Sequence, residues 1–280
     1  MKLLVVLLIL AGLKLDAFEW EKKNDSLALL QGKNVIWRHV HSEKEAKPFF
    51  HPLSTPSGYI LSDLKPSDHP WHRGLWFSWK YINGVNFWEE NRESGKSAGT
   101  TKIVDFKAIP QENFSANIEM KIHYFIDPSI VLLQEIRTLN VSPPEGGKYT
   151  INWTSKFTAL EDIFLDRTPL PEEKGGKPYG GYAGLSFRAA RELRNKKGWS
   201  FLDSENKPLV HGQKASDLSF KGPDGFIKII PLKPHLNHSW YIATGMPYFS
   251  PALLFEKGME MKKNTELNLA YKIEISSTEK

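Results

Sequence analysis

Two histidines, an acid and an arginine lie within seven residues of this chain, in the segment Asp-His-Pro-Trp-His-Arg-Gly at 68–74. Imidazole is the side chain best suited to proton transfer near neutral pH, and it is also a common metal ligand. Because a proline disfavours helical geometry in the residue before it, Pro70 predicts a loop. In a loop, His69 and His72 can act as acid–base residues, with Asp68 orienting one imidazole, or ligate one divalent metal ion. In a structural alternative, Asp68 caps a turn and His72 satisfies buried backbone groups.

Tryptophans are concentrated around this segment, at Trp71, Trp76, Trp79 and Trp88. Polar groups that are dense among aromatic rings are typical of a ligand cleft. Arg73 offers a planar fork of donors for a carboxylate or for vicinal hydroxyls, so we expect Arg73 and His51 to hold substrate oxygens. Trp76 or Trp88 would then provide a wall on which a sugar ring stacks. In the structural alternative, Arg73 pairs with an internal acid instead.

A second candidate segment is Pro-Tyr-Gly-Gly-Tyr-Ala-Gly-Leu-Ser-Phe-Arg-Ala-Ala-Arg at 178–191. Its glycine spacing matches neither of the common phosphate-binding loops, so the glycines are expected to allow tight backbone geometry. Tyr179, Tyr182 and Arg188 either face a ligand or serve the fold alone. The residues leave this choice open.

A third segment, 231–241, follows an expected strand and contains His235 and His238. Loops at strand ends commonly hold site residues, so we expect His235 to complete the cleft. We expect His238 to be an exposed loop residue, and the histidines at 39, 41, 123 and 211 to lie at the surface.

The sequence argues against one hydrolase mechanism and leaves another open. The sequence contains no Gly-X-Ser-X-Gly element, which argues against a serine hydrolase. A glycosidase with two carboxylates stays open, although the sequence cannot give the separation between carboxylates. The candidates are Asp68, Glu89, Glu90, Glu135, Asp162 and Asp166.

The elements that must position these residues are strands. Apolar residues alternate with polar ones in the segments 114–126, 148–157 and 266–275, and this period of two predicts half-buried strands. A further strand is expected at 130–141. Gly- and Pro-rich turns separate the strands, and the segments 114–126, 130–141 and 148–157 predict an antiparallel meander. The best helical candidate is short, at 186–197. We therefore expect an all-β fold, with one large antiparallel β-sandwich domain over residues 18–280.

Composition excludes several classes of protein. The 280 residues include no cysteine, which excludes disulfides, thiolate metal sites and a lipid anchor on cysteine. The net charge is +5, and Lys and Arg are scattered among the acids. Nucleic-acid binding is not expected, because no basic stripe or known recognition module is present.

The first 17 residues have the pattern of a secretory signal peptide. Lys2 precedes an apolar run from Leu3 to Leu13, and cleavage after Ala17 is expected. Removal of two lysines and one aspartate would then lower the net charge from +5 to +4. No later segment is long and apolar enough to span a membrane, so we expect an exported protein that is periplasmic or extracellular and not inserted in a membrane.

Five segments together resemble those of a bacterial family labelled methane oxygenase PmoA, which is also treated as a domain of unknown function. They are FFHPLSTPSG, DHPWHRGLWFSW, NGVNFWEE, YGGYAGLSFRAAR and YFSPALLF, and they run through most of the chain after residue 17. The usual central motif of that family is similar to Asp-His-Pro-His-His-Arg-Gly. Trp71 replaces its middle histidine here, so no ligand is required at 71, whereas His69 and His72 match. We reject the oxygenase activity in the label, because such a subunit spans the membrane.

The resemblance implies a secreted β-protein of bacteria that degrade complex glycans, with a fold similar to galactose-mutarotase-like β-sandwiches. We therefore expect a carbohydrate-active enzyme that acts on a glycoside or sugar, with hydrolysis ranked before epimerisation or elimination. The expected cofactor is either none or one divalent metal ion on His69 and His72. The alternative is a glycan-binding protein that uses the same cleft without catalysis.

Overall fold

The structure is a computed structural model that describes residues 17–194, 196–235 and 238–278. Within these ranges the chain forms three antiparallel β-sheets of nine, eight and four strands, and one short 3-10 helix. Among the described residues no helix is both long and apolar enough to cross a membrane. Apart from Ala17, the predicted signal peptide at 1–17 lies outside the described residues, so it stays a prediction.

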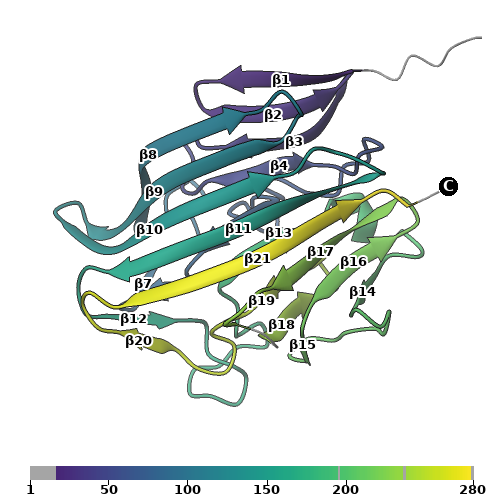
Figure 1. The fold of residues 1–280 in the computed structure, drawn as a ribbon. Helices are drawn as coiled ribbons and strands as arrows, with labels where there is room; N and C mark the ends of the chain where they lie inside the picture. Colours follow the sequence, from purple (N-terminus) through teal and green to yellow (C-terminus); the bar gives the residue numbers. More distant parts are fainter. Residues whose placement is uncertain (1–16, 195, 236–237, 279–280) are drawn as a thin grey trace, which may run out of the picture.

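The eight-stranded sheet contains the longest strands, which lie side by side in Figure 1. Its order is β14 (Ser200–Leu202), β16 (Leu218–Gly222), β17 (Gly225–Pro231), β21 (Glu266–Ser276), β11 (Lys148–Ala159), β10 (Ile130–Val141), β9 (Ala116–Asp127) and β8 (Thr100–Pro110). The strands expected at 114–126, 130–141, 148–157 and 266–275 are therefore confirmed. The predicted meander is also confirmed, because β9, β10 and β11 are neighbours in the sheet.

The nine-stranded sheet combines the N-terminal strands with strands from the middle and the end of the chain. Its order is β1 (Phe18–Lys23), β2 (Ser26–Gln31), β3 (Asn34–Val40), β4 (Phe49–Leu53), β5 (Leu75–Ser78), β13 (Gly184–Arg188), β19 (Tyr248–Pro251), β18 (His238–Ala243) and β15 (Lys214–Ala215). The four-stranded sheet has the order β20 (Met259–Met261), β12 (Ile163–Asp166), β6 (Tyr81–Ile82) and β7 (Val85–Asn86).

The main hydrophobic core is built from inward-facing side chains of both large sheets. Trp153 of β11 lies between Leu139 of β10 and Tyr271 of β21 in the sheet register, and all three are buried. Phe77 and Trp240 contribute to the same cluster from the nine-stranded sheet. The expected all-β antiparallel sandwich is therefore confirmed.

The opposite face of the nine-stranded sheet carries a second aromatic cluster. Successive residues of a strand point to opposite faces. Leu75 and Phe77 of β5 belong to the main core, whereas Trp76 between them belongs to the second cluster. Tyr241 of β18 and Tyr248 of β19 join Trp76 there by the same alternation. This outer face is the platform on which the candidate site is built.

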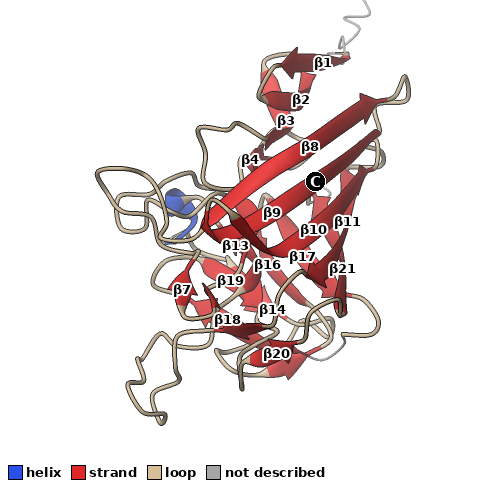
Figure 2. Ribbon diagram, turned by 90° about the vertical axis from the view of Figure 1, so that its left-hand side faces the viewer, coloured by secondary structure: helices blue, strands red, loops and turns tan. Residues whose placement is uncertain are grey.

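The helix expected at 186–197 is wrong for most of its length. Ser186–Arg188 belong to β13, which pairs with β5 on one side and β19 on the other. Only Arg191–Arg194 form the short 3-10 helix, drawn blue in Figure 2. All five residues of β13 are buried, and pairing in the middle of a sheet overrides a weak helical pattern.

Two histidines expected at the surface are also buried. His39 in β3 is fully buried and stacks on His41 at 5.8 Å. His238 begins β18 instead of lying in an exposed loop, and it is buried next to His235. One face of each such strand is buried, and the sequence does not show which polar residues lie on that buried face.

Candidate functional site

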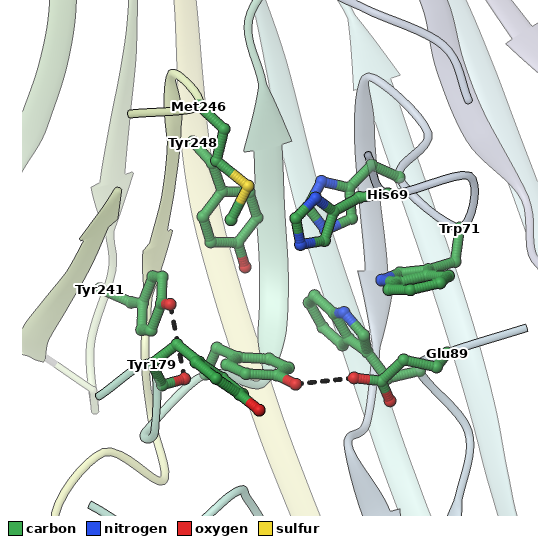
Figure 3. Close-up of a pocket in the computed structure, with 10 residues that line it drawn as sticks. His69, Trp71, Glu89, Tyr179, Tyr241, Met246 and Tyr248 are labelled. Atoms are coloured by element: carbon green, nitrogen blue, oxygen red, sulfur yellow. Dashed lines mark hydrogen bonds between the residues drawn. The ribbon is translucent and has the colours of Figure 1, made fainter. Parts of the chain in front are cut away.

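A cavity of about 310 Å³ opens on the outer face of the nine-stranded sheet. Segments that are distant in the sequence form its walls: the loop 68–74, the residues after β7, the segment before β13, and β18 with β19 (Figure 3). The lining residues are His69, Trp71, His72, Trp88, Glu89, Tyr179, Tyr182, Tyr241, Met246 and Tyr248.

The loop 68–74 is a series of tight turns between β4 and β5, as Pro70 predicted. The amide of His69 donates to the carbonyl of Pro66 at 3.0 Å, and the amide of His72 donates to the carbonyl of His69 at 3.0 Å. Gly74 ends the loop with φ +70°, where a side chain would place Cβ 2.4 Å from the carbonyl oxygen of Phe50. Only glycine combines this conformation with so close an approach. The turns hold both histidines over the sheet.

Asp68 and Arg188 orient His69 from behind. Nδ1 of His69 lies 3.0 Å from the Asp68 carboxylate, which also receives two hydrogen bonds from Arg188 Nη2, at 2.9 and 3.1 Å. Burial raises the pKa of Asp68, but the hydrogen bonds from Arg188 and His69 outweigh it and hold that pKa well below its usual range. Asp68 is therefore a carboxylate that accepts the Nδ1 proton, which leaves Nε2 of His69 as the basic nitrogen.

His72 lies beneath His69 and differs from it in being buried. Its ring stacks on His69 at 4.7 Å and on Tyr248 at 5.2 Å, and its side chain is buried. Burial lowers the pKa of His72 well below its usual value, and the charges of His69 and Arg188 lower it further. His72 is therefore neutral at physiological pH and serves as part of the cavity floor.

Glu89 supplies the carboxylate that lines the cavity. It forms an ion pair with buried Lys80, and it accepts hydrogen bonds from Asn86 at 2.6 Å and from the hydroxyl of Tyr182 at 2.7 Å. Burial raises the pKa of Glu89, but the charge of Lys80 and these hydrogen bonds lower it below its ordinary value. Glu89 is therefore ionised, and its position is fixed by three partners.

Six aromatic side chains make up most of the remaining wall: Trp71, Trp88, Tyr179, Tyr182, Tyr241 and Tyr248. The Tyr241 hydroxyl donates to the carbonyl of Tyr179 at 3.4 Å (Figure 3). Burial raises the pKa of Tyr241 to about 12, so this hydroxyl stays protonated. The walls combine flat apolar faces with a few polar groups, an arrangement typical of sites for small ligands.

The structure brings most of the predicted site residues together. His69, His72, Trp88 and Tyr179 line the cavity, and Asp68 lies directly behind His69. Two more lie one layer away: Arg188 contacts Asp68, and Trp76 packs under His72 and Trp88 at 5.0 and 5.7 Å. Trp76 is fully buried, so it supports the cavity and is not itself the stacking wall that we expected.

Three predicted residues lie elsewhere. Arg73 does not line the cavity, because its guanidinium pairs with Glu45 and Glu90, as in the structural alternative. His51 in β4 lies 2.9 Å from the Ser62 hydroxyl and does not line the cavity. His235 lies beside His238, in the loop before β18, also outside the cavity lining.

Among the described residues, no third ligand lies close enough to complete a metal centre on His69 and His72. In the part of the chain that the structure describes, no group of three His, Cys, Asp or Glu side chains converges so as to hold a metal ion. The nearby carboxylate of Asp68 is directed at the Nδ1 atom of His69 and at Arg188. The arrangement of these three side chains fits acid–base chemistry.

Sequence reasoning missed four of the cavity residues or gave them too little weight. Tyr241, Met246 and Tyr248 were not singled out, and Glu89 was one of six candidate carboxylates. The available signal was the alternation in β18 and β19, which places one aromatic residue on the outer face of each strand. A sandwich core explains the same alternation, so the pattern alone did not indicate a site.

Comparison with known proteins places the chain in a group without an assigned activity. Residues 26–280 match the model of a family described as a family of unknown function (DUF6807). A search of curated proteins finds no match.

Two solved structures are similar in fold. One is the α-galactosidase from Lactobacillus brevis, at 8% sequence identity and a TM-score of 0.47. The alignment covers 94% of this chain and 39% of the α-galactosidase, so this chain spans about two fifths of that protein. The other is a galactose mutarotase related enzyme from Lactobacillus acidophilus, at 8% identity and a TM-score of 0.38, with 94% of this chain and 98% of that chain covered.

Proposed function

The chain belongs to the family of unknown function DUF6807, and we propose that its cavity binds a sugar to or from which His69 transfers a proton. One observation carries the proposal. The oriented pair Asp68–His69, held by Arg188, lies at an aromatic cavity that also contains the ionised Glu89. An imidazole held by a carboxylate and facing a cavity is the arrangement that a general base needs.

A sugar suits this cavity in size and in chemistry. Its volume of about 310 Å³ lies at the lower end of the range for small-molecule sites, roughly 300–1,000 Å³. Sugar rings have apolar C–H faces that pack on aromatic rings such as Trp88 and Tyr241, and hydroxyls that bond to polar groups at the edges. Glu89 and the tyrosine hydroxyls supply acceptors and donors for those hydroxyls.

The geometry favours proton transfer at carbon over hydrolysis by two carboxylates. A glycosidase of that type places two carboxylates on either side of the scissile bond. Of the six carboxylates considered from the sequence, Glu89 alone lines the cavity within the described residues. We therefore rank epimerisation or elimination, with His69 as base, before hydrolysis. Export remains part of the proposal on the strength of the predicted signal peptide.

The test combines binding with exchange of solvent deuterium. The purified protein is incubated in D₂O with a panel of hexoses, hexuronates and their methyl glycosides, and deuterium at ring carbons is followed by NMR. We expect incorporation or turnover for one class of sugar, and its loss in His69→Gln with affinity changed by less than about threefold. The matched control is His123→Gln, whose ring lies on β9 and does not line the cavity.

Two outcomes would contradict the proposal. Sugar binding without exchange or turnover in the wild-type protein would favour the alternative of a glycan-binding protein without catalysis. The absence of binding to every sugar in the panel would overturn the sugar assignment itself.

A further inference from the structure

A second hollow lies on the other side of the loop 68–74. This groove has a volume of about 540 Å³ and is formed by the chain around 41–48, 90–97 and 99–103. It shares walls with the cavity, because neighbouring residues line opposite hollows. Trp71 and Glu89 line the cavity, whereas Pro70, Arg73 and Glu90 line the groove.

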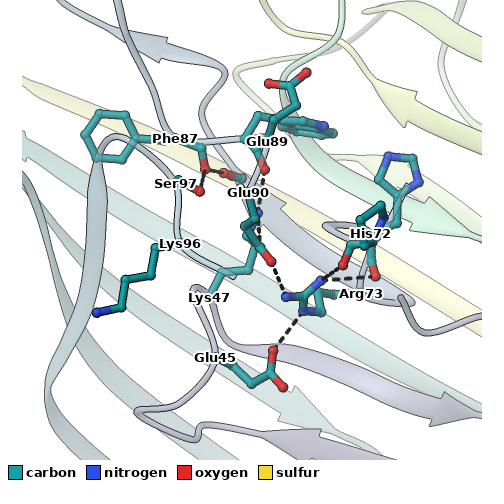
Figure 4. Close-up of polar contacts among 12 residues, drawn as sticks. Glu45, Lys47, His72, Arg73, Phe87, Glu89, Glu90, Lys96 and Ser97 are labelled. Carbon is teal, nitrogen blue, oxygen red and sulfur yellow. Dashed lines mark hydrogen bonds and ion pairs between the residues drawn. The ribbon is translucent and has the colours of Figure 1, made fainter. Parts of the chain in front are cut away.

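The floor of the groove is a network of paired charges. Arg73 pairs with Glu45 at 3.0 Å and with Glu90 at 2.5 Å, and Lys47 lies 3.2 Å from Glu90 (Figure 4). The Lys47 ammonium also donates to the carbonyl of Trp88 at 2.9 Å. Lys65 also pairs with Glu45, at 2.7 Å, so both carboxylates of the floor are engaged by cations.

The rim of the groove is not balanced. Seven Lys or Arg side chains and three Glu side chains line the whole groove, which is a surplus of four positive charges. Lys44, Lys96 and Lys102 are exposed and form no ion pair with any residue that the structure describes. Positive charge gathered along a concave surface attracts anionic ligands and raises their local concentration.

A cation–π contact lies on the ridge between the cavity and the groove. The guanidinium of Arg92 lies over the ring of Trp71 at 5.9 Å and donates to the carbonyl of Ser67 at 3.1 Å. Trp71 lines the cavity and Arg92 lines the groove. A ligand that extends from the cavity across this ridge would meet an aromatic face and then a cation.

We propose that the groove is a subsite for the acidic part of an oligosaccharide, carrying carboxylates or sulfates, whose terminal sugar occupies the cavity. This inference rests on the proposed sugar-binding function and names the class of substrate. Within the described residues Glu89 is the one carboxylate that lines the cavity, and it is paired with Lys80, so of the two hollows the groove is the one with a positive surplus. Acidic groups are therefore recognised beyond the terminal sugar.

The experiment measures binding of three tetrasaccharides by calorimetry at 50 and 200 mM NaCl: a neutral galactotetraose, a tetragalacturonate, and a sulfated galactan tetrasaccharide. We expect the wild-type protein to bind an acidic probe about tenfold more tightly than the neutral one at the lower salt concentration, with the difference reduced at the higher one. The triple variant Lys44→Gln, Lys96→Gln and Lys102→Gln should lose about tenfold in affinity for that acidic probe and leave the neutral probe unaffected.

A control variant removes the same charge from elsewhere. Lys22, Lys33 and Lys257 are exposed, form no ion pair with a described residue and do not line the groove. Changing these three to Gln should leave affinity for both acidic probes within twofold of the wild-type value. An equal loss in this control would show a general effect of net charge and overturn the groove assignment.

Failure of the inference and failure of the proposed function give different results. If the neutral probe binds and the acidic probes bind no more tightly, the groove assignment is wrong, whereas the proposal of a sugar-binding cavity is retained. If none of the three probes binds, while the hexoses and hexuronates also fail, the proposed function falls together with the inference. Preference for the sulfated or the carboxylated probe identifies the acidic group.

Discussion

At the scale of single residues, the property that defines the site is the chain of contacts Arg188–Asp68–His69. Arg188 is buried in β13, and its partner lies 120 positions earlier in the sequence. Asp68 in turn fixes which nitrogen of His69 carries the proton. The tautomer of His69 is thus set by partners that are already in place in the folded protein.

Replacing Asp68 should misorient His69 without removing it. In Asp68→Asn the amide can present its nitrogen to Nδ1, so the proton-bearing nitrogen of His69 is no longer fixed, and the ion pair with Arg188 is lost. We expect kcat to fall about 10²-fold or more with little change in KM. Turnover is measured beside Asp105→Asn, an exposed control on β8. If Asp68→Asn retains full turnover while His69→Gln is inactive, Asp68 has no part in orienting the base.

Lys80 should act on the site through Glu89. Lys80 lowers the pKa of Glu89 by its charge and by an ion pair, so in Lys80→Met that pKa should rise. Glu89 would then become protonated at a higher pH, and the acid limb of the kcat/KM profile should move to higher pH. Lys80→Arg keeps the charge and should restore the wild-type profile. A profile that moves equally in both variants would point to a change in packing.

At the scale of elements, the loop 68–74 is held by charges that meet across three segments. Lys47 precedes β4, Arg73 precedes β5 and Glu90 follows β7, and all three side chains are buried. Burial lowers the pKa of Lys47 to about 8, although the charge of Glu90 opposes this shift. Glu90 therefore links the segments before β4 and β5 through its side chain.

Removal of Glu90 should be costly, because it leaves two buried cations without their common partner. In Glu90→Gln we expect the free energy of unfolding to fall by about 3–5 kcal/mol, the cost of breaking a buried pair from one side. Urea denaturation at pH 7 measures this loss. The control is Glu93→Gln, an exposed change in the adjoining loop that should have an effect below about 0.5 kcal/mol. A small loss in Glu90→Gln would show that the network is screened by water.

At the scale of the whole molecule, buried histidines link stability to pH. Burial lowers the pKa of His51 and of His238 to about 4, and it lowers the pKa of His39 and of His72 well below the usual value. His51 Nδ1 lies 2.9 Å from the Ser62 hydroxyl, whose oxygen also accepts from the amide of Leu53. These rings are neutral in the folded protein.

Stability should therefore fall as the pH falls from about 6.5 to about 4. Across this window the unfolded chain binds protons at these histidines and the folded protein does not, which costs about 1.4 kcal/mol per pH unit for each ring. Below about pH 4, His51 and His238 bind protons in both states and their contribution levels off. Urea denaturation at half-unit steps measures the slope. His51→Gln should reduce this slope by one proton, and equal slopes in the wild type and His51→Gln would contradict the linkage.

The sequence predicted the fold better than the site. The strands β9, β11 and β21 follow from local alternation, because a side chain's face is set by its position in the strand. The weak helical pattern at 186–197 failed because β13 pairs on both sides in the nine-stranded sheet. Propensity is overridden where pairing and burial decide the conformation.

By itself the sequence determined the antiparallel strands and the loop at Pro70, because these depend on residues that are neighbours in the chain. Only the tertiary structure decided that Arg73 pairs with Glu90 and that Arg188 reaches Asp68. It also decided that Glu89 faces the cavity. These contacts join strands and loops far apart in the sequence, and no local pattern records which segments the folded sheets bring together. The physical reason is that a charged side chain acquires its role from the partners that folding places around it.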